Sequence, residues 1–140
     1  MTPVMPATPV MPSPPSDPPP RRVRHKDALG RRGEDIAAAH LERCGVRVLA
    51  RNWRCREGEI DIVAHDAGTL VAVEVKTRTS LRFGSPLDAV TPAKLRRLRR
   101  LARSWTAEHG RPGSRIRIDA MTVLTGTGGR MFLRHHRGIG

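Results

Sequence analysis

A run of three strand-like segments in the middle of the chain constrains its fold most strongly. Residues 46–54, 59–65 and 70–78 are rich in β-branched and apolar side chains, which is typical of strands. Glu57-Gly58 separates the first two segments, and Asp66-Ala67-Gly68-Thr69 separates the second from the third. Such short connections predict antiparallel hairpins, so we expect a β-sheet at the centre of the fold.

A helical pattern precedes this run. Residues 27–44 carry apolar side chains at helical spacing. Asp27 is suited to cap the start of a helix there, and Gly45 is suited to end it. Gly30 and Gly33 lower the helix propensity of the first turns, so we expect those turns to be irregular.

A second helix and two further strands follow the run. Thr91-Pro92 supplies a cap and a proline at the first helical position, and Gly110 ends the pattern. Residues 115–124 and 131–134 then have strand patterns, and Arg117 with Asp119 is expected to form surface pairs. The predicted order α-β-β-β-α-β, with a short final strand, indicates a mixed α/β domain built on a central sheet.

The N-terminal residues differ sharply in composition from the rest. Residues 1–20 contain nine of the twelve prolines, and proline removes amide donors and fixes φ, so neither helix nor sheet is expected there. We predict a disordered, proline-rich tail over residues 1–24. The folded domain is expected to cover residues 25–135, followed by a disordered C-terminus at 136–140.

The charge of the chain limits its partners. It has 26 lysines and arginines against 13 acidic residues, a formal charge of +13, which predicts a polyanionic partner, either nucleic acid or an anionic membrane surface. No apolar run is long enough for stable membrane insertion. No secretory signal is visible, so a cytoplasmic location is expected. Two cysteines indicate neither a disulfide framework nor a zinc site.

Acidic residues are nevertheless concentrated in one region. Residues 55–90 carry six acidic and four basic side chains. If Ala67-Gly68 forms a two-residue turn, Asp61 lies opposite Glu74 with Lys76 on the same face. Two opposed carboxylates are destabilising unless a cation lies between them, and a hard divalent ion such as Mg²⁺ suits them. The alternative is an exposed cross-strand salt bridge, because the same register places Glu59 opposite Lys76.

Several motifs together resemble a known family. They are Gly33-Glu34, Gly58-Glu59-Ile60-Asp61-Ile62-Val63 and Val73-Glu74-Val75-Lys76-Thr77-Arg78, with Phe83-Gly84, Val90 and Lys94 behind them. The combination resembles the YraN family, a bacterial group with a restriction-endonuclease-like fold, over about residues 26–124. The resemblance implies an α/β core with a central mixed β-sheet flanked by helices.

The resemblance also implies a chemistry. The wider superfamily, which includes archaeal Holliday-junction resolvases, uses a D-(x)n-E-x-K metal site with a helical glutamate. Carried over by position, Asp61, Glu74 and the Val75 carbonyl would bind Mg²⁺ or Mn²⁺, and Glu34 would complete the shell directly or through water. Lys76 would orient or deprotonate the attacking water. The implied activity is that of a metal-dependent nuclease. DNA is the expected substrate more than RNA, with branched or structured DNA as a candidate form. Junction-cutting relatives act as dimers, which implies a homodimer here.

Basic residues near these motifs are candidates for contacting phosphates. They are Arg31, Arg32, Arg78, Lys94 and Arg97. A solvated helix face or a membrane-surface helix would explain the basic residues of 91–110 without nucleic acid. Two other functions also remain open, a non-catalytic nucleic-acid-binding protein with the same fold and an interaction protein recruited through its charge.

Overall fold

The computed structural model describes residues 27–79 and 90–140, and the predicted proline-rich tail and Phe83-Gly84 lie outside these ranges. The described elements follow the predicted order. They are α1 (Ala28–Arg43), β1 (Arg47–Cys55), β2 (Gly58–Asp66), β3 (Thr69–Arg78), α2 (Pro92–Glu108), β4 (Arg115–Thr125), the 3₁₀ turn η2 (Thr127–Gly129) and β5 (Met131–His136).

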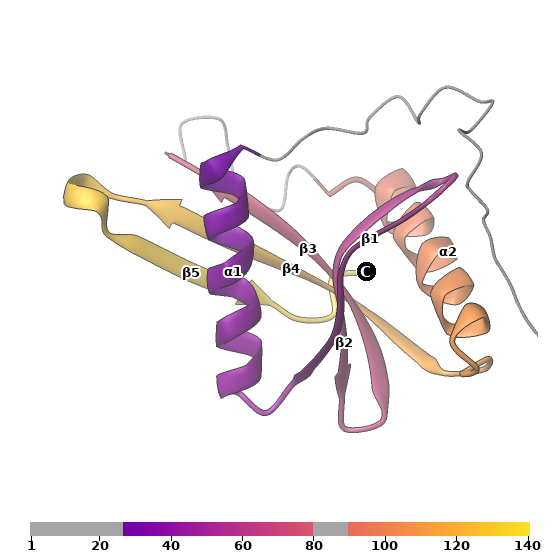
Figure 1. Ribbon diagram of the computed structural model, residues 1–140. Coiled ribbons are helices and arrows are strands. Elements are labelled where there is room, and N and C mark those ends of the chain that lie inside the picture. The colour runs from indigo at the N-terminus through magenta and orange to yellow at the C-terminus, as the bar shows by residue number, and fades with distance from the viewer. Residues whose placement is uncertain (1–26, 80–89) are drawn as a thin grey trace, which may run out of the picture.

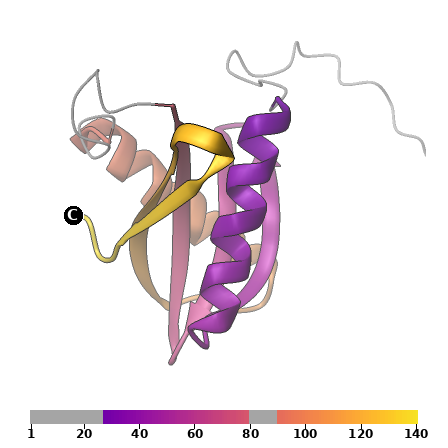
Figure 2. The same ribbon diagram turned by 90° about the vertical axis from the view of Figure 1, so that its left-hand side faces the viewer.

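The five strands form one mixed sheet in the order β1-β2-β3-β4-β5. β3 and β4 are parallel, with α2 between them in sequence, and the other neighbouring pairs are antiparallel. α1 covers one face of the sheet and α2 covers the other (Figures 1 and 2). This architecture confirms the predicted α/β class with a central mixed sheet, and it is consistent with a restriction-endonuclease-like fold. None of the described helices is long and apolar enough to cross a bilayer.

Each helix buries an apolar core against its own face of the sheet. On the α1 face the buried residues are Ala37, Ala38, Leu41, Val46, Ile62, Ala64, Val71, Val73 and Met121. On the α2 face they are Ile60, Val63, Leu70, Ala72, Leu98, Leu101, Ala102, Trp105 and Ile118. Successive residues of Ile62–Ala64 and of Leu70–Val73 therefore enter opposite cores, as strand periodicity requires, whereas Ile60 lies in the α2-side core and departs from this alternation.

The β2–β3 turn is the predicted two-residue turn. Ala67 and Gly68 both have positive φ, 48° and 89°, as the hairpin turn that fits the right-handed twist of strands requires. Pairing runs from Asp66–Thr69 to Ile62–Val73, so the predicted register is confirmed. The pairing ends just before Asp61 and Glu74, and Asp61 Oδ2 accepts a hydrogen bond from the Val75 N–H.

The start of α1 is more regular than predicted. The Asp27 Oδ1 atom accepts a hydrogen bond from the Gly30 N–H at 2.8 Å, and the helix is continuous from Ala28. Gly33 is buried because α1 approaches β3 there, and a Cβ at this position would overlap Thr77 Oγ1. The glycine therefore permits close helix–strand packing next to the predicted site.

Gly33→Ala is expected to destabilise the fold by about 1–3 kcal/mol, because overpacking outweighs the better helix propensity of alanine. Combining it with Thr77→Ala should recover part of this loss, because the overlapping hydroxyl is removed. Urea unfolding of both single variants and the double variant measures the coupling. Additive losses would show that the Gly33–Thr77 contact does not set the helix position.

The Arg117–Asp119 pair is buried, so the predicted surface pair is wrong. Asp119 is 0% exposed, and both of its oxygens accept hydrogen bonds from Arg117, at 2.8 and 3.0 Å. His135 Nε2 lies 2.8 Å from Asp119 Oδ2, and the Gly138 N–H donates to Oδ1 at 2.9 Å. β5 and the segment after it cover this carboxylate, which the pattern of β4 alone could not indicate.

The C-terminal residues differ from the expected disorder. β5 extends to His136, the Ile139 N–H donates to the Ile118 carbonyl at 2.8 Å, and Ile139 packs against the α2-side core. Arg99 donates to the Gly140 carbonyl at 2.7 Å. Contacts with β4 and α2 thus hold this segment.

Candidate metal and phosphate site

The candidate site lies where the β1–β2 hairpin separates from β3. β2–β3 pairing ends at Ile62–Val73, whereas β3 remains paired with β4 as far as Arg78. Figure 1 shows the hairpin and β3 diverging toward the end of the sheet at which both helices begin. The sheet therefore opens between the start of β2 and the end of β3, with a helix N-terminus on either face.

Asp61 spans this opening. Its Oδ2 atom accepts a hydrogen bond from the Val75 N–H at 2.8 Å. In a regular antiparallel ladder a backbone carbonyl of β2 would accept the hydrogen bond from the Val75 N–H. The N–H and C=O groups of one strand residue point toward the same neighbouring strand. The Val75 carbonyl accordingly faces the side of β3 on which Asp61 lies. The structure thus brings together the Asp61 carboxylate and the Val75 backbone.

Glu74 is the buried charge of the site. Its side chain is 10% exposed, and its Oε2 atom lies 3.1 Å from Lys76 Nζ and 2.9 Å from Lys94 Nζ. Lys76 is two residues further along β3 and so lies on the same face. Lys94 comes from the first turn of α2, where Thr91 Oγ1 caps the Lys94 N–H at 3.1 Å. Glu74 therefore holds two ammonium groups from two different elements.

The two lysines govern the ionisation of Glu74. Burial opposes its charged form, but the charges of Lys94 and Lys76 outweigh burial and lower the pKa of Glu74 below its ordinary value. Burial also lowers the pKa of Lys94, against the attraction of Glu74. Glu74 consequently stabilises the fold above its ordinary pKa, and this contribution is lost as the pH falls through the lowered value.

The alternative pairing of Glu59 with Lys76 is not the one formed. Glu59 Oε1 lies 3.9 Å from Arg54 Nε of β1, whereas Lys76 contacts Glu74. The two strands have already diverged at this point, so opposite positions in the extrapolated register no longer meet. The lysine of the E-x-K motif is thus directed to the glutamate of the same motif.

Glu34 tethers α1 to β1. It is 2% exposed, and its Oε1 atom accepts hydrogen bonds from Arg51 at 3.2 Å and from Asn52 Nδ2 at 2.8 Å. Asn52 has a positive φ of 53° within β1. These contacts fix the hairpin relative to α1. Sequence reasoning missed Arg51 and Asn52, because nothing in a strand pattern marks them as partners of a helical glutamate.

The donor atoms fit a hard divalent cation in part. Asp61, Glu74 and the Val75 carbonyl carry the oxygen atoms that could ligate such an ion, and Mg²⁺ prefers oxygen ligands. The described residues contain no group of three or more acidic, histidine or cysteine side chains placed to hold one metal ion, so Glu34 is not gathered with Asp61 and Glu74. A cation would be held by two carboxylates and backbone oxygen, with water completing its shell.

The predicted phosphate-contacting residues take different positions. Arg31 and Arg32 are exposed in the first turns of α1, Arg78 is exposed at the end of β3, and Arg97 is exposed on α2. The Arg97 side chain lies beside Gly58 at the start of β2. Lys94 instead joins the carboxylate site. The one feature of the sequence that hinted at a contact between Lys94 and Glu74 is the presence of a lysine in an arginine-rich helix. This feature alone is too weak to assign the contact.

Comparison with known proteins supports the family membership that the sequence motifs indicate. Residues 33–123 match the family described as "Uncharacterised protein family UPF0102". A UPF0102 protein of Beutenbergia cavernae is 52% identical over 118 residues, which cover 84% of this chain and 100% of that protein. One of Renibacterium salmoninarum is 53% identical with the same coverage. One of Frankia casuarinae is 50% identical over 116 residues, 83% of this chain and 98% of that protein. The chain therefore belongs to the UPF0102 family, which is the YraN family that its motifs predicted.

Proposed function

We propose that this protein is a metal-dependent nuclease that hydrolyses phosphodiester bonds in nucleic acid, with DNA favoured over RNA and branched or structured DNA as the substrate class. The observation that carries the proposal is the 2.8 Å hydrogen bond between Asp61 Oδ2 and the Val75 N–H. It holds a carboxylate of β2 against the Glu74-Val75-Lys76 segment where the sheet opens. An ordinary pair of sheet residues would not need the strands to separate there.

The residues have distinct roles in this proposal. Asp61, Glu74 and the Val75 carbonyl would hold Mg²⁺ or Mn²⁺, which would lower the pKa of a bound water and polarise the phosphoryl oxygen. Lys76 and Lys94 place two positive charges beside Glu74, where they attract and orient a phosphate. Glu34 fixes the β1–β2 hairpin and thereby the position of Asp61.

Charge and helix direction support a nucleic-acid substrate. The formal charge of +13 raises the local concentration of any polyanion. Both helices begin at the open end of the sheet (Figure 1), and the positive ends of their dipoles favour anions there. Exposed Arg31, Arg32, Arg78 and Arg97 would contact the phosphates that flank the scissile bond. We place this activity in the cytoplasm.

One observation favours a second candidate, a non-catalytic nucleic-acid-binding protein with the same fold. Glu74 Oε2 is already held by two ammonium groups, and such a cluster is a complete structural ion-pair network without a metal. In that case the carboxylates would stabilise the sheet opening, and nucleic-acid binding would be independent of Mg²⁺.

Calorimetry and a cleavage assay separate the two candidates. We expect the full chain to bind Mg²⁺ and to cut a labelled branched DNA only when a divalent ion is present. The double variant Asp61→Ala/Glu74→Ala should lose both the binding heat and the cleavage, and circular dichroism checks that it folds. Equal heats from both proteins, with unchanged DNA affinity, would refute the nuclease and establish the binding protein.

A further inference from the structure

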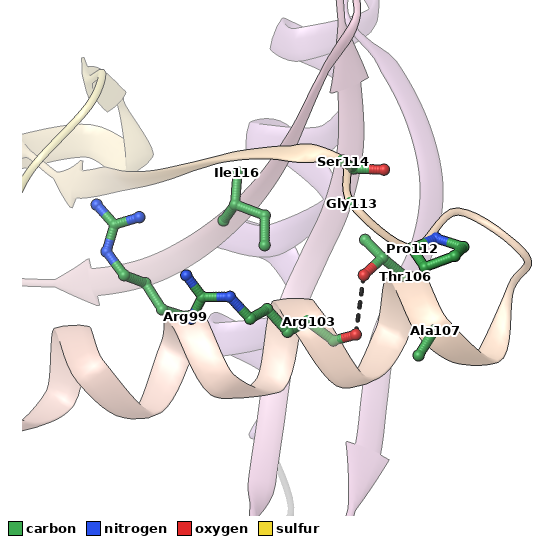
Figure 3. A pocket seen from close by; sticks show the side chains of 8 residues that line it. All are labelled: Arg99, Arg103, Thr106, Ala107, Pro112, Gly113, Ser114 and Ile116. Atoms are coloured by element: carbon green, nitrogen blue, oxygen red, sulfur yellow. Dashed lines mark hydrogen bonds between the residues drawn. The ribbon is translucent and has the colours of Figure 1, made fainter.

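A pocket separate from the carboxylate site lies between the C-terminal half of α2 and the start of β4. Its volume is about 340 Å³, and its lining residues are Arg99, Arg103, Thr106, Ala107, Pro112, Gly113, Ser114 and Ile116. Figure 3 shows Arg99 and Arg103 extending from α2 on the side that faces β4. None of the eight lining residues is acidic, so the pocket presents only positive charge.

The two arginines supply the charged donors of this pocket. Thr106 Oγ1 donates its proton to the Arg103 carbonyl at 2.8 Å, and Ser114 Oγ donates to the Arg111 carbonyl at 2.6 Å. The hydroxyl protons are thus committed within the protein. Arg99 is oriented by its hydrogen bond to the Gly140 carbonyl, and the Arg103 guanidinium forms no ion pair with any described residue.

We propose that this pocket binds a backbone phosphate of the nucleic acid, at a distance from the bond that is cut. Guanidinium groups bind phosphate oxygens through paired, charge-assisted hydrogen bonds. The apolar side chains of Pro112 and Ile116 form the rest of the wall and suit contact with the sugar that adjoins the phosphate. This inference rests on the nucleic-acid substrate of the proposed function.

The position of the pocket on α2 connects it to the site. Lys94 and Arg103 are nine residues apart on one helix, and nine residues of α-helix span about 14 Å. Phosphates along one strand of a duplex are spaced by about 3.4 Å along its axis, so this distance corresponds to roughly four nucleotides. Nine residues also make two and a half turns, so Arg103 leaves α2 on the side opposite to Lys94. A nucleic acid that contacts both places must therefore pass across α2 rather than run along it.

A membrane surface is a poorer partner for the same charges. A helix that lies in a membrane interface needs an exposed apolar face, but Leu98, Leu101 and Trp105 of α2 are buried against the sheet. Phe132 on β5 is the one large apolar side chain that is exposed among the described residues, and β5 does not line the pocket. A pocket with two guanidinium groups on one wall suits a single phosphate group better than a flat lipid surface.

Fluorescence anisotropy with a labelled 20-base-pair duplex tests the proposal on the full chain. Arg103→Ala should weaken binding about tenfold, as expected for one charge-assisted contact, and should reduce the slope of log K against log salt by about 0.9. Arg103→Lys should keep the salt slope but recover only part of the affinity, because lysine lacks the paired donors. Arg100→Ala is the matched control, since Arg100 is exposed on α2 and does not line the pocket.

Several outcomes would overturn the inference. Equal weakening by Arg103→Ala and Arg100→Ala would mean that only the overall charge matters. Tighter binding to phosphatidylglycerol vesicles than to DNA, with loss in Arg103→Ala, would make the ligand a lipid headgroup. The wild-type protein could bind DNA, lose affinity as predicted in Arg103→Ala, and yet cleave no substrate. In that case the nuclease proposal fails and the proposed phosphate pocket stands.

Discussion

Asp61→Asn is expected to reduce Mg²⁺-dependent cleavage by a factor of roughly 10³ or more, since a catalytic metal supplies several kcal/mol and each 1.36 kcal/mol is tenfold in rate. The amide oxygen of asparagine can still accept the Val75 N–H that Asp61 Oδ2 accepts at 2.8 Å. The local backbone contact is therefore kept while the negative charge is removed. Initial cleavage rates in Mg²⁺, with rates in a chelator as the baseline, measure the effect.

Glu108→Gln is the matched control for this prediction. Glu108 is an exposed carboxylate in the last turn of α2, so its loss changes the net charge by the same amount without altering Glu34, Asp61 or Glu74. This variant should retain nearly full cleavage. Similar rates for Asp61→Asn and the wild type would show that the carboxylate of β2 has no part in the reaction.

Asp119→Ala is expected to lower the free energy of unfolding by about 3–5 kcal/mol, the usual cost of removing one partner from a buried ion pair. The substitution leaves Arg117 with Asp66 alone, at 3.0 Å, and removes the partner of His135 and of the Gly138 N–H. Urea unfolding at neutral pH measures the loss, with Asp35→Ala as a surface control. A loss under 1 kcal/mol would contradict this account of the network.

The same network predicts a dependence on pH. Burial raises the pKa of Asp119, but hydrogen bonds from His135, Arg117 and Gly138 outweigh burial and lower it from 3.8 to about 2. This difference corresponds to about 2 kcal/mol of stability. The contribution is complete above pH 3.8 and is lost as the pH falls toward 2. The gap in stability between the wild type and Asp119→Ala should therefore narrow over this range, and an unchanged gap would refute the lowered pKa.

Much of the fold could be predicted from short-range patterns. The Ala67-Gly68 turn and the alternation of apolar residues in β2 and β3 specify which residues pair, because a slip of one residue would expose the buried side chains of both strands. The caps at Asp27 and Thr91 mark where the helices begin. In each case the interacting groups are close in the chain, so the spacing of the residues is enough to predict the turn, the strand pairing and the helix starts.

Other parts of the site depend on contacts that no local pattern encodes. The Glu74–Lys94 pair needs the start of α2 to lie over the end of β3, and the Glu34–Asn52 contact needs α1 to lie against β1. The burial of Asp119 needs β5 and the residues after it. Sequence reasoning consequently assigned Lys94 to phosphate contact alone and Asp119 to the surface.

The sequence by itself determined the order of the elements, the register of the β2–β3 hairpin and the family of the chain. Only the tertiary structure decided that Glu74 binds two lysines, that Glu34 is directed to β1, and that Arg99 and Arg103 share a pocket. The physical reason is the range of the interactions. Hydrogen-bonded turns and apolar periodicity act over a few residues, whereas charged side chains pair with whatever the packing of helices on the sheet brings within about 4 Å.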